Sequence, residues 1–245
     1  MRDEPARTIE AVLFDVGAVL IGPSAAAVQD IFRETAHTFV RSGHAARAFA
    51  LADRDADRAG LVLTDVRSWA RHWSQALRVD ESVGWAVHQR ILEDPALTSR
   101  VWSEVNPDAA DAMSRLREVK VPVGLVSQSD GHVDVRLARA GLAHLVDVVV
   151  DSGRVPWDKP NPAIYRHAAT LIGVPLSRCA FLGDVLTDVR GAVRAGCAHA
   201  FLYDPHEVCP DSEVPRATSL NAFVDVVLGG VPGRLPGRRG NLLAG

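Results

Sequence analysis

Short runs of consecutive apolar residues are the first regular feature of the chain. The first run covers residues 11–14 and stops at Asp15 and Gly17. Similar runs occur later, at residues 121–126, 145–150, 179–182 and 200–203. A continuous apolar run that ends at a polar residue is typical of a strand buried on both faces of a parallel sheet. These runs therefore predict the strands of such a sheet.

Amphipathic segments with helix-capping residues separate the later runs. Asn106 with Pro107 and Asn161 with Pro162 are expected to begin helices, because Asn caps free N–H groups and Pro suits the first turn. The glycines expected to end helices are Gly141, Gly173 and Gly196. Alternating strands and helices predict an α/β fold with a doubly wound, Rossmann-like parallel sheet, whose ligands bind at the carboxyl ends of the strands.

The stretch between residues 24 and 105 interrupts this alternation. It has no strand-like run, and its apolar residues recur at helical spacing, as in Val66, Trp69 and Trp73. We interpret it as an insertion of four or five helices. The expected division is a core of residues 1–22 and 106–228, a helical insertion of residues 23–105 and a flexible tail of residues 229–245, which is rich in Gly, Pro and Arg.

Composition limits the class of partner and the compartment. A net charge of -3 predicts no nucleic-acid partner, since no extended basic face is expected. Three cysteines without metal-ligand spacing predict reduced thiols and a cytoplasmic protein, and the charged first residues do not resemble a secretory signal. No apolar stretch is long enough for a membrane span. The oligomeric state stays open.

Four polar residues follow or lie just beyond strand-like runs: Asp15, Ser127, Lys159 and Asp184. In a parallel sheet such positions meet at one edge, so all four are expected to face one pocket. Asp15 and Asp184 offer the carboxylate oxygens that Mg²⁺ prefers. Lys159 would offset the charge of a phosphoryl group, and Ser127 would donate to one of its oxygens.

Four segments around these residues resemble motifs of the haloacid dehalogenase superfamily. They read FDVGAVL at residues 14–20, LVSQ at 125–128, KPNPAIY at 159–165 and FLGDVLTDVRGA at 181–192. The order of the four motifs agrees with the predicted topology. The insertion occupies the position of the family's first type of cap domain, which closes over the site and selects the substrate.

The resemblance implies a magnesium-dependent phosphatase of a small phosphorylated metabolite that forms an aspartyl-phosphate. Asp15 would be the nucleophile, and Ser127, Gln128 and Lys159 would bind the phosphoryl group. The Mg²⁺ ligands would be Asp15, the Gly17 carbonyl and Asp184. Asp188 would orient Lys159 or a water, although it would also suit an ion pair with Arg190 or a helix cap.

Gly17 departs from the family pattern. Most phosphatases of the family have an aspartate there that protonates the leaving group, a contribution typically worth about 100- to 10,000-fold. An aspartate introduced at this position would strain the loop if Gly17 has a positive φ. The candidate substitute acids are histidines: His37, His44, His72, His88 and His132. We interpret residues 53–58 as a solvated helix face with charge pairs, and Arg41, Arg47 and Arg71 as possible anchors for an anionic substrate.

Two other functions are considered. A dehalogenase that attacks carbon would usually have an aromatic residue at position 17 and would lack the acidic fourth motif, so Gly17 and Asp184 argue against it. A catalytically impaired binding protein would explain Gly17, Val19 and Val185, which replace more polar residues of the family pattern. Magnesium-dependent release of phosphate from an aryl phosphate separates these alternatives. The substrate itself is not readable from the cap sequence.

Overall fold

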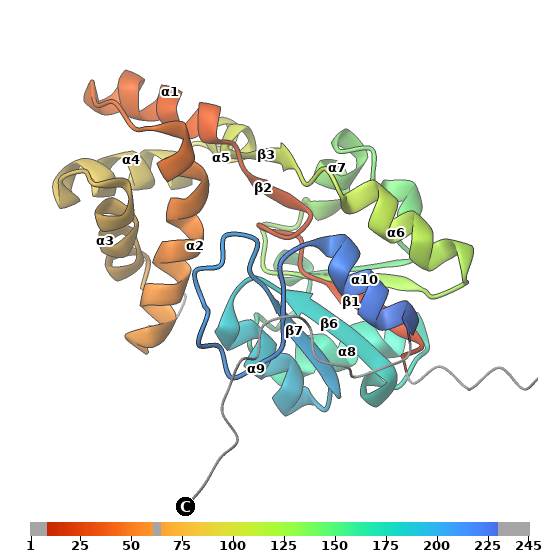
Figure 1. Ribbon diagram of the computed structural model, residues 1–245. Helices are drawn as coiled ribbons and strands as arrows, with labels where there is room; N and C mark the ends of the chain where they lie inside the picture. Colours follow the sequence, from red (N-terminus) through yellow and green to blue (C-terminus); the bar gives the residue numbers. More distant parts are fainter. Residues whose placement is uncertain (1–8, 61–64, 230–245) are drawn as a thin grey trace, which may run out of the picture.

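A sheet of six parallel strands forms the centre of the molecule (Figure 1). The computed structural model describes residues 9–60 and 65–229, so the expectations for the first eight residues and for residues 230–245 lie outside the described residues. The strand order is β5-β4-β1-β6-β7-β8. The strands are β1 (Ala11–Phe14), β4 (Val123–Ser127), β5 (Val148–Asp151), β6 (Cys179–Gly183), β7 (His199–Tyr203) and β8 (Arg216–Ala217).

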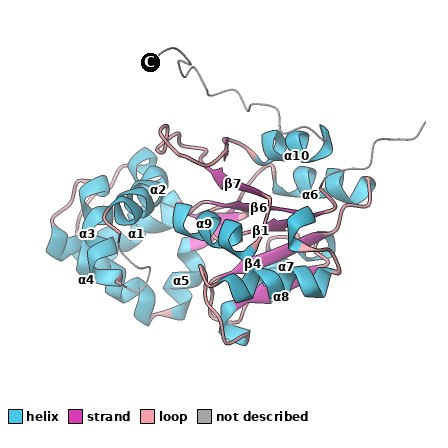
Figure 2. Ribbon diagram, turned by 90° about the horizontal axis from the view of Figure 1, so that it is seen from below, coloured by secondary structure: helices cyan, strands magenta, loops and turns pink. Residues whose placement is uncertain are grey.

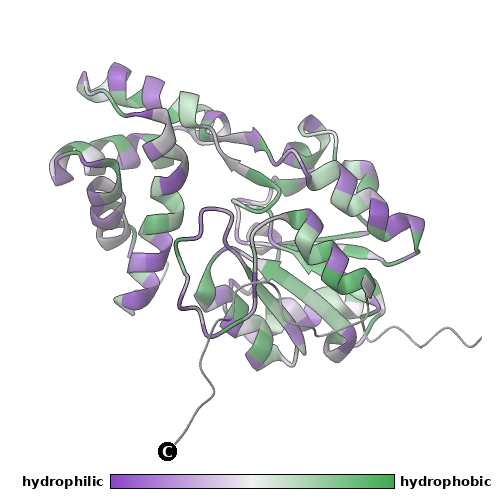
Figure 3. Cartoon of the chain, viewed as in Figure 1, coloured by the Kyte–Doolittle hydropathy of each residue, from purple (hydrophilic) through white to green (hydrophobic). Residues whose placement is uncertain are grey.

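Helices cover both faces of this sheet (Figure 2), which confirms the predicted doubly wound α/β class. Val12 and Phe14 of β1 belong to one hydrophobic cluster, and Ala11 and Leu13 belong to another on the opposite face. The first cluster includes α6 (Ala109–Glu118), α7 (Val133–Arg139) and α10 (Leu220–Gly229), and the second includes α8 (Pro162–Ile172) and α9 (Leu186–Ala195). Because β1 is buried on both faces, its whole sequence is apolar, and Figure 3 shows this concentration of apolar residues in the strands.

The helix boundaries agree only partly with the predicted caps. Asn161 accepts a hydrogen bond from the Ala163 N–H (3.0 Å), and α8 ends at Gly173 in the left-handed region, with φ 76°. The helix expected to begin at Asn106 and Pro107 begins later, at Ala109. Asn106 Oδ1 accepts a hydrogen bond from the Asp108 N–H (3.1 Å), just before this helix. The Asn106 amide nitrogen donates to the Val19 carbonyl (2.8 Å) and to the Tyr203 hydroxyl (2.7 Å), which fixes this connection to the core.

A separate helical cluster, here called the cap, occupies the stretch between β2 and β3 (Figure 1). Its helices in the described part of the chain are α1 (Ala25–Ala36), α2 (Ser42–Arg58), α3 (Val66–Leu77), α4 (Glu81–Glu93) and α5 (Pro95–Val101). Trp73 is completely buried at its centre, 5.4 Å from Phe32 and 5.3 Å from Phe49 between ring centroids. The cap therefore has a hydrophobic core of its own.

The cap is attached through a two-stranded antiparallel ribbon that the sequence analysis missed. It consists of β2 (Ile21–Pro23) and β3 (Trp102–Val105), with Ile21 opposite Val105 and Gly22 opposite Glu104. The strand β3 lies inside the stretch expected to be wholly helical. Most of its residues are exposed, so it lacks the continuous apolar run by which the other strands were found.

Two smaller corrections concern the expected ends of elements. Leu145 lies in a short 3₁₀ turn, and β5 begins only at Val148. Gly229, assigned to the tail, is the last residue of α10.

Among the described helices none combines the length and the hydrophobicity needed to cross a membrane.

Candidate active site

The predicted site residues lie at the carboxyl edge of the sheet. Asp15 and Asp184 follow β1 and β6 directly, and Ser127 is the last residue of β4. Asp15 and Ser127 are buried, whereas Asp184 is partly exposed and Gln128 is exposed. Since β1 pairs with both β4 and β6, these strand ends are neighbours, as the topology of a parallel sheet requires.

Lys159 joins two carboxylates in the interior. Its ammonium group contacts Asp15 Oδ2 and lies 2.8 Å from Asp188 Oδ2. The side chains of Lys159, Asp15 and Asp188 are only 3%, 6% and 2% exposed. Burial alone would lower the pKa of Lys159, but the charges of Asp15 and Asp188 raise it well above its usual value. Lys159 is therefore a permanent cation between the two acids, and Asp188 pairs with it rather than with Arg190.

Close helix packing fixes the backbone next to Lys159. The Lys159–Pro160 peptide is cis, and Gly191 of α9 packs against Pro160. A Cβ atom at position 191 would lie 2.8 Å from the Cβ and the carbonyl oxygen of Pro160, closer than folded proteins allow. The Tyr165 hydroxyl of α8 donates to the backbone carbonyl of Asp188 (2.8 Å) and ties α8 to α9. Small size at Gly191 thus lets Lys159 reach both carboxylates.

The site contains more negative charge than its lysine balances. Burial and the charges of Asp15 and Asp53 raise the pKa of Asp184 well above its usual value, and burial likewise raises the pKa of Asp188. Asp188 Oδ1 is buried and has no hydrogen-bond partner among the residues that the structure describes. Buried polar atoms normally have partners, so this oxygen and the clustered acids fit a site that takes up a cation and its water.

The available ligand set suits Mg²⁺ better than a metal held entirely by side chains. No group of three or more His, Cys, Asp or Glu side chains in the described ranges forms a complete metal site. Mg²⁺ usually needs only one or two carboxylates, together with substrate phosphate and water. Asp15 and Asp184 can supply the carboxylates. The Gly17 carbonyl accepts one hydrogen bond, from the Val19 N–H (2.7 Å), which leaves its other lone pair for a metal.

The loop after Asp15 does not have the positive φ at Gly17 that the sequence analysis considered. Ala18, rather than Gly17, has a positive φ, of 54°. A Cβ atom at position 17 would meet Trp102 at an ordinary contact distance of 3.8 Å. Backbone strain therefore does not require glycine at position 17, and the space beside it is bounded by an aromatic ring of β3.

A buried acid that the sequence analysis did not single out holds the loop beyond Ser127. Asp151, the last residue of β5, accepts hydrogen bonds from the N–H groups of Gly131 (3.1 Å), Val133 (3.1 Å) and Gly153 (3.0 Å). Its position at a strand end is the signal that would have identified it. Asp151 gives the segment after β4 a fixed course, which in turn positions Ser127 and Gln128.

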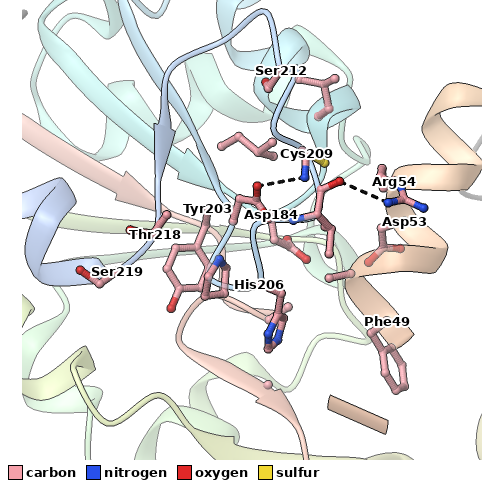
Figure 4. Close-up of a pocket in the computed structure, with 18 of the residues that line it drawn as sticks. Phe49, Asp53, Arg54, Asp184, Tyr203, His206, Cys209, Ser212, Thr218 and Ser219 are labelled. Carbon is pink, nitrogen blue, oxygen red and sulfur yellow. Dashed lines mark hydrogen bonds between the residues drawn. The ribbon is translucent and has the colours of Figure 1, made fainter. Parts of the chain in front are cut away.

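A cavity of about 750 Å³ lies where the cap meets the core (Figure 4). Asp53 and Arg54 of α2 form part of one wall, and Asp184, Tyr203 and His206 belong to the core side. Ala18 also lines the cavity, so the cavity extends to the loop after Asp15, although Asp15, Ser127 and Lys159 do not line it.

Residues 53–58 are therefore not simply a solvated helix face. Arg54 does pair with Asp55, as expected, at 2.7 Å. Asp57 instead accepts a hydrogen bond from the Thr187 hydroxyl and lies 3.3 Å from Arg190 Nη1, and Arg54 donates to the Val208 carbonyl (3.3 Å). These contacts connect α2 to α9 and to the loop after β7. Helical periodicity cannot reveal a contact with a core that is distant in the sequence.

The other candidate residues do not line this cavity. None of the predicted histidines and none of Arg41, Arg47 and Arg71 lines it. His88 is enclosed by aromatic rings, including Trp69 at 5.0 Å between centroids, and burial lowers its pKa to about 4. His206, which was not among the candidates, lines the cavity but is exposed.

The chain belongs to the haloacid dehalogenase-like hydrolase family, since the model of that family matches residues 9–196. It is 35% identical over 121 residues to "Phosphatase MT3486" of Mycobacterium tuberculosis, a match covering 49% of this chain and 55% of that protein. The chain thus spans about half the length of this curated relative.

Solved structures of the family share the fold. The HAD-hydrolase YfnB of Bacillus subtilis, described as bound to magnesium, has a TM-score of 0.63 at 18% identity, with 89% of this chain and 98% of that chain covered. The L-2-haloacid dehalogenase RSc1362 has a TM-score of 0.60 at 20% identity, with 90% and 99% covered. At these identities the likeness concerns the fold alone. The family membership and the resemblance in sequence motifs agree.

Proposed function

We propose that this hydrolase is a magnesium-dependent phosphatase of a small phosphorylated metabolite and acts through an aspartyl-phosphate. The observation that carries the proposal is the arrangement of Asp15, Lys159 and Asp188, a buried carboxylate at a strand end held by a cation that a second acid orients. Asp184 and the unpartnered Asp188 Oδ1 add a place for a metal and its water. The phosphatase relative supports the same chemistry.

Each residue of the site has its own role in the proposed reaction. Asp15 attacks phosphorus, and the bond from phosphorus to the leaving oxygen breaks as the Asp15–phosphorus bond forms. Lys159, which contacts Asp15, also offsets the negative charge of the phosphoryl oxygens, and Ser127 donates a hydrogen bond to them. Asp188 keeps Lys159 in place. Asp15, the Gly17 carbonyl and Asp184 would hold Mg²⁺, which would supply the positive charge that lets a carboxylate approach a phosphate.

The first test measures phosphate release from an aryl phosphate with Mg²⁺ and with EDTA. We expect turnover only with Mg²⁺, and a loss of about 10,000-fold or more in Asp15→Asn, because the amide is no nucleophile. A thermal melt of the variant checks its fold. Turnover that survives in Asp15→Asn would remove the assigned nucleophile. Release of halide from a 2-haloacid without metal, with no phosphate release, would instead establish the dehalogenase reaction.

The second test measures the metal directly. Asp184→Ala is expected to weaken Mg²⁺ binding in a calorimetric titration, since one of two carboxylate ligands is lost. Asp130→Ala is the matched control, because Asp130 also follows a strand of the sheet, β4, but pairs with Arg136 at the surface (2.7 Å). Equal Mg²⁺ affinity in the parent and in Asp184→Ala would show that the ligands are elsewhere. Absence of any Mg²⁺ binding and of any turnover would favour an impaired binding protein.

A further inference from the structure

Position 17 supplies no proton donor for the reaction proposed above. Gly17 stands where most phosphatases of the resembled family have an acid, and the space next to it faces the Trp102 ring. Ser127 and Lys159 serve the phosphoryl oxygens, and Asp188 is engaged by Lys159. An ester with an alkoxide leaving group therefore needs an acid from another residue that lines the cavity.

Asp53 is the carboxyl group of the cap that faces the core acids. It lies on α2, lines the same cavity as Asp184, and appears across that cavity from Asp184 in Figure 4. Its carboxylate accepts a hydrogen bond from the Trp69 indole N–H (2.6 Å), which fixes the side chain from α3. No other side-chain partner of Asp53 is present among the described residues, so one oxygen is free to face a ligand.

The surroundings of Asp53 favour its protonated form. Burial raises its pKa to about 7, the Trp69 hydrogen bond opposes this rise, and the charges of Asp188 and Asp15 add to it. Asp184 faces it from β6, and Lys159 is shared between Asp15 and Asp188. On the cap side, Arg54 is occupied by Asp55 and the Val208 carbonyl, and Asp57 by Thr187 and Arg190.

If the proposed phosphatase function holds, as this inference requires, we propose that Asp53 of the cap is the general acid and base of this enzyme. It would replace the acid that is missing at position 17. In the first step Asp53 gives its proton to the leaving oxygen as the bond to phosphorus breaks. In the second step its carboxylate takes a proton from the water that attacks the aspartyl-phosphate. Phosphate and Asp15 are released, and Asp53 is protonated again, so that protons balance over the cycle.

The test compares Asp53→Asn with the parent on alkyl and aryl phosphates. Asparagine keeps an acceptor for Trp69 but carries no exchangeable acid proton of suitable pKa. We expect kcat/KM to fall about 100-fold or more for an alkyl phosphate and to stay within about threefold for an aryl phosphate, whose leaving group needs little protonation.

A second readout follows the intermediate rather than turnover. Because Asp53→Asn lacks the base for the second step, aryl phosphate should give a burst of phenol and an enzyme whose intact mass is increased by one phosphoryl group. The parent should show neither. Asp53→Ser, read in the same two ways, replaces Asp53→Asn if a thermal melt shows that the latter is unfolded.

Two control variants sharpen the assignment. Asp55→Asn changes an acid of the same helix that does not line the cavity, and it should leave the ratio of alkyl to aryl rates unchanged. His206→Gln changes the rival titratable group of the cavity, and it should leave the ratio unchanged as well. If His206→Gln shows the selective loss instead, the acid is His206.

The possible failures are distinguishable. An active parent whose Asp53→Asn variant loses kcat/KM for alkyl and aryl phosphates equally, or for neither, overturns the role of Asp53 and leaves the phosphatase function in place. A parent that releases no phosphate from any ester overturns the proposed function, and the inference about Asp53 falls with it.

Discussion

The carboxyl edge of the core sheet and the cap helix α2 hold their aspartates in different ways. Asp15 and Asp188 are almost fully buried and share the Lys159 ammonium group, so their positions are fixed by ion pairs within one domain. Asp53 is only partly buried and is fixed by a single neutral donor, the Trp69 indole. Ion pairs with one buried lysine therefore position the core acids, whereas a single hydrogen bond from a neutral donor positions Asp53. The two settings agree with the different roles proposed for Asp15 and Asp53.

The largest effect is expected when the cation of the core is removed. Lys159→Met would leave Asp15 and Asp188 facing each other without compensation, and breaking such a buried pair costs about 3–5 kcal/mol. Urea unfolding in EDTA measures this loss. Arg154→Met breaks the exposed pair with Asp134 and should change the free energy of unfolding little, because solvent screens that pair. If Lys159→Met lowered the free energy of unfolding as little as Arg154→Met does, the buried ion pairs would not be what fixes the core acids.

A smaller effect is expected from a methyl group on α9. Gly191→Ala places a Cβ atom 2.8 Å from atoms of Pro160. The resulting overpacking should cost about 1–3 kcal/mol and lower kcat, because Lys159 is displaced together with its neighbour. Gly43→Ala in the cap helix α2 is the control, since its new Cβ atom meets nothing within 4 Å. Stability and kcat that stay unchanged in Gly191→Ala would show that the position of Lys159 does not depend on this packing.

The contact between α2 and α9 should affect substrate binding more than chemistry. Asp57→Ala removes the acceptor of the Thr187 hydroxyl and the partner of Arg190. We expect a loss of about 1 kcal/mol in stability and a several-fold rise in KM, with kcat changing less, because the cap is held less firmly over the cavity. Steady-state kinetics and thermal melts measure both, with Asp55→Ala as the matched variant. A fall in kcat at constant KM would mean that Asp57 acts on the reacting groups.

The smallest effect on activity is expected from Gly17→Asp as a single substitution. Gly17→Asp should fold normally, since the position has no positive φ and meets Trp102 at 3.8 Å. If Asp53 already supplies the proton, alkyl phosphate turnover should rise by about threefold or less. The same substitution in Asp53→Asn should recover alkyl activity by a larger factor. Equal gains in both backgrounds would show that the two positions act independently.

The sequence predicted the core more completely than the cap because the core signals are local. Continuous apolar runs mark β1 and β6, and the polar residue after each run lies at the edge where the chemistry was expected. The pairing of Lys159 with Asp188 was anticipated among alternatives, whereas the vacant Asp188 Oδ1 and the tight contact between Gly191 and Pro160 depend on packing. The expected magnesium ligands, the binding roles of Ser127 and Gln128, and the cytoplasmic location stay predictions.

The role of Asp53 could not be inferred from its own segment. Its neighbours Arg54, Asp55 and Asp57 carry charges of both signs, which is equally typical of a solvent-exposed helix. What distinguishes Asp53 is the indole of Trp69 in another helix and the core acids on the other side of the cavity. Both contacts are made only when the cap folds and meets the core.

The ribbon that carries the cap also makes this protein a natural scaffold for grafting. Pro23 and Trp102 are paired across β2 and β3, so the inserted domain leaves and re-enters the core at neighbouring points. Insertions with adjacent ends disturb a host fold little, because the gap they leave is short enough for a turn to close. A cap from another enzyme, joined at the same two residues, would therefore replace the proposed proton donor and the cap wall of the cavity in one step, while the core with Asp15, Lys159 and Asp188 is retained.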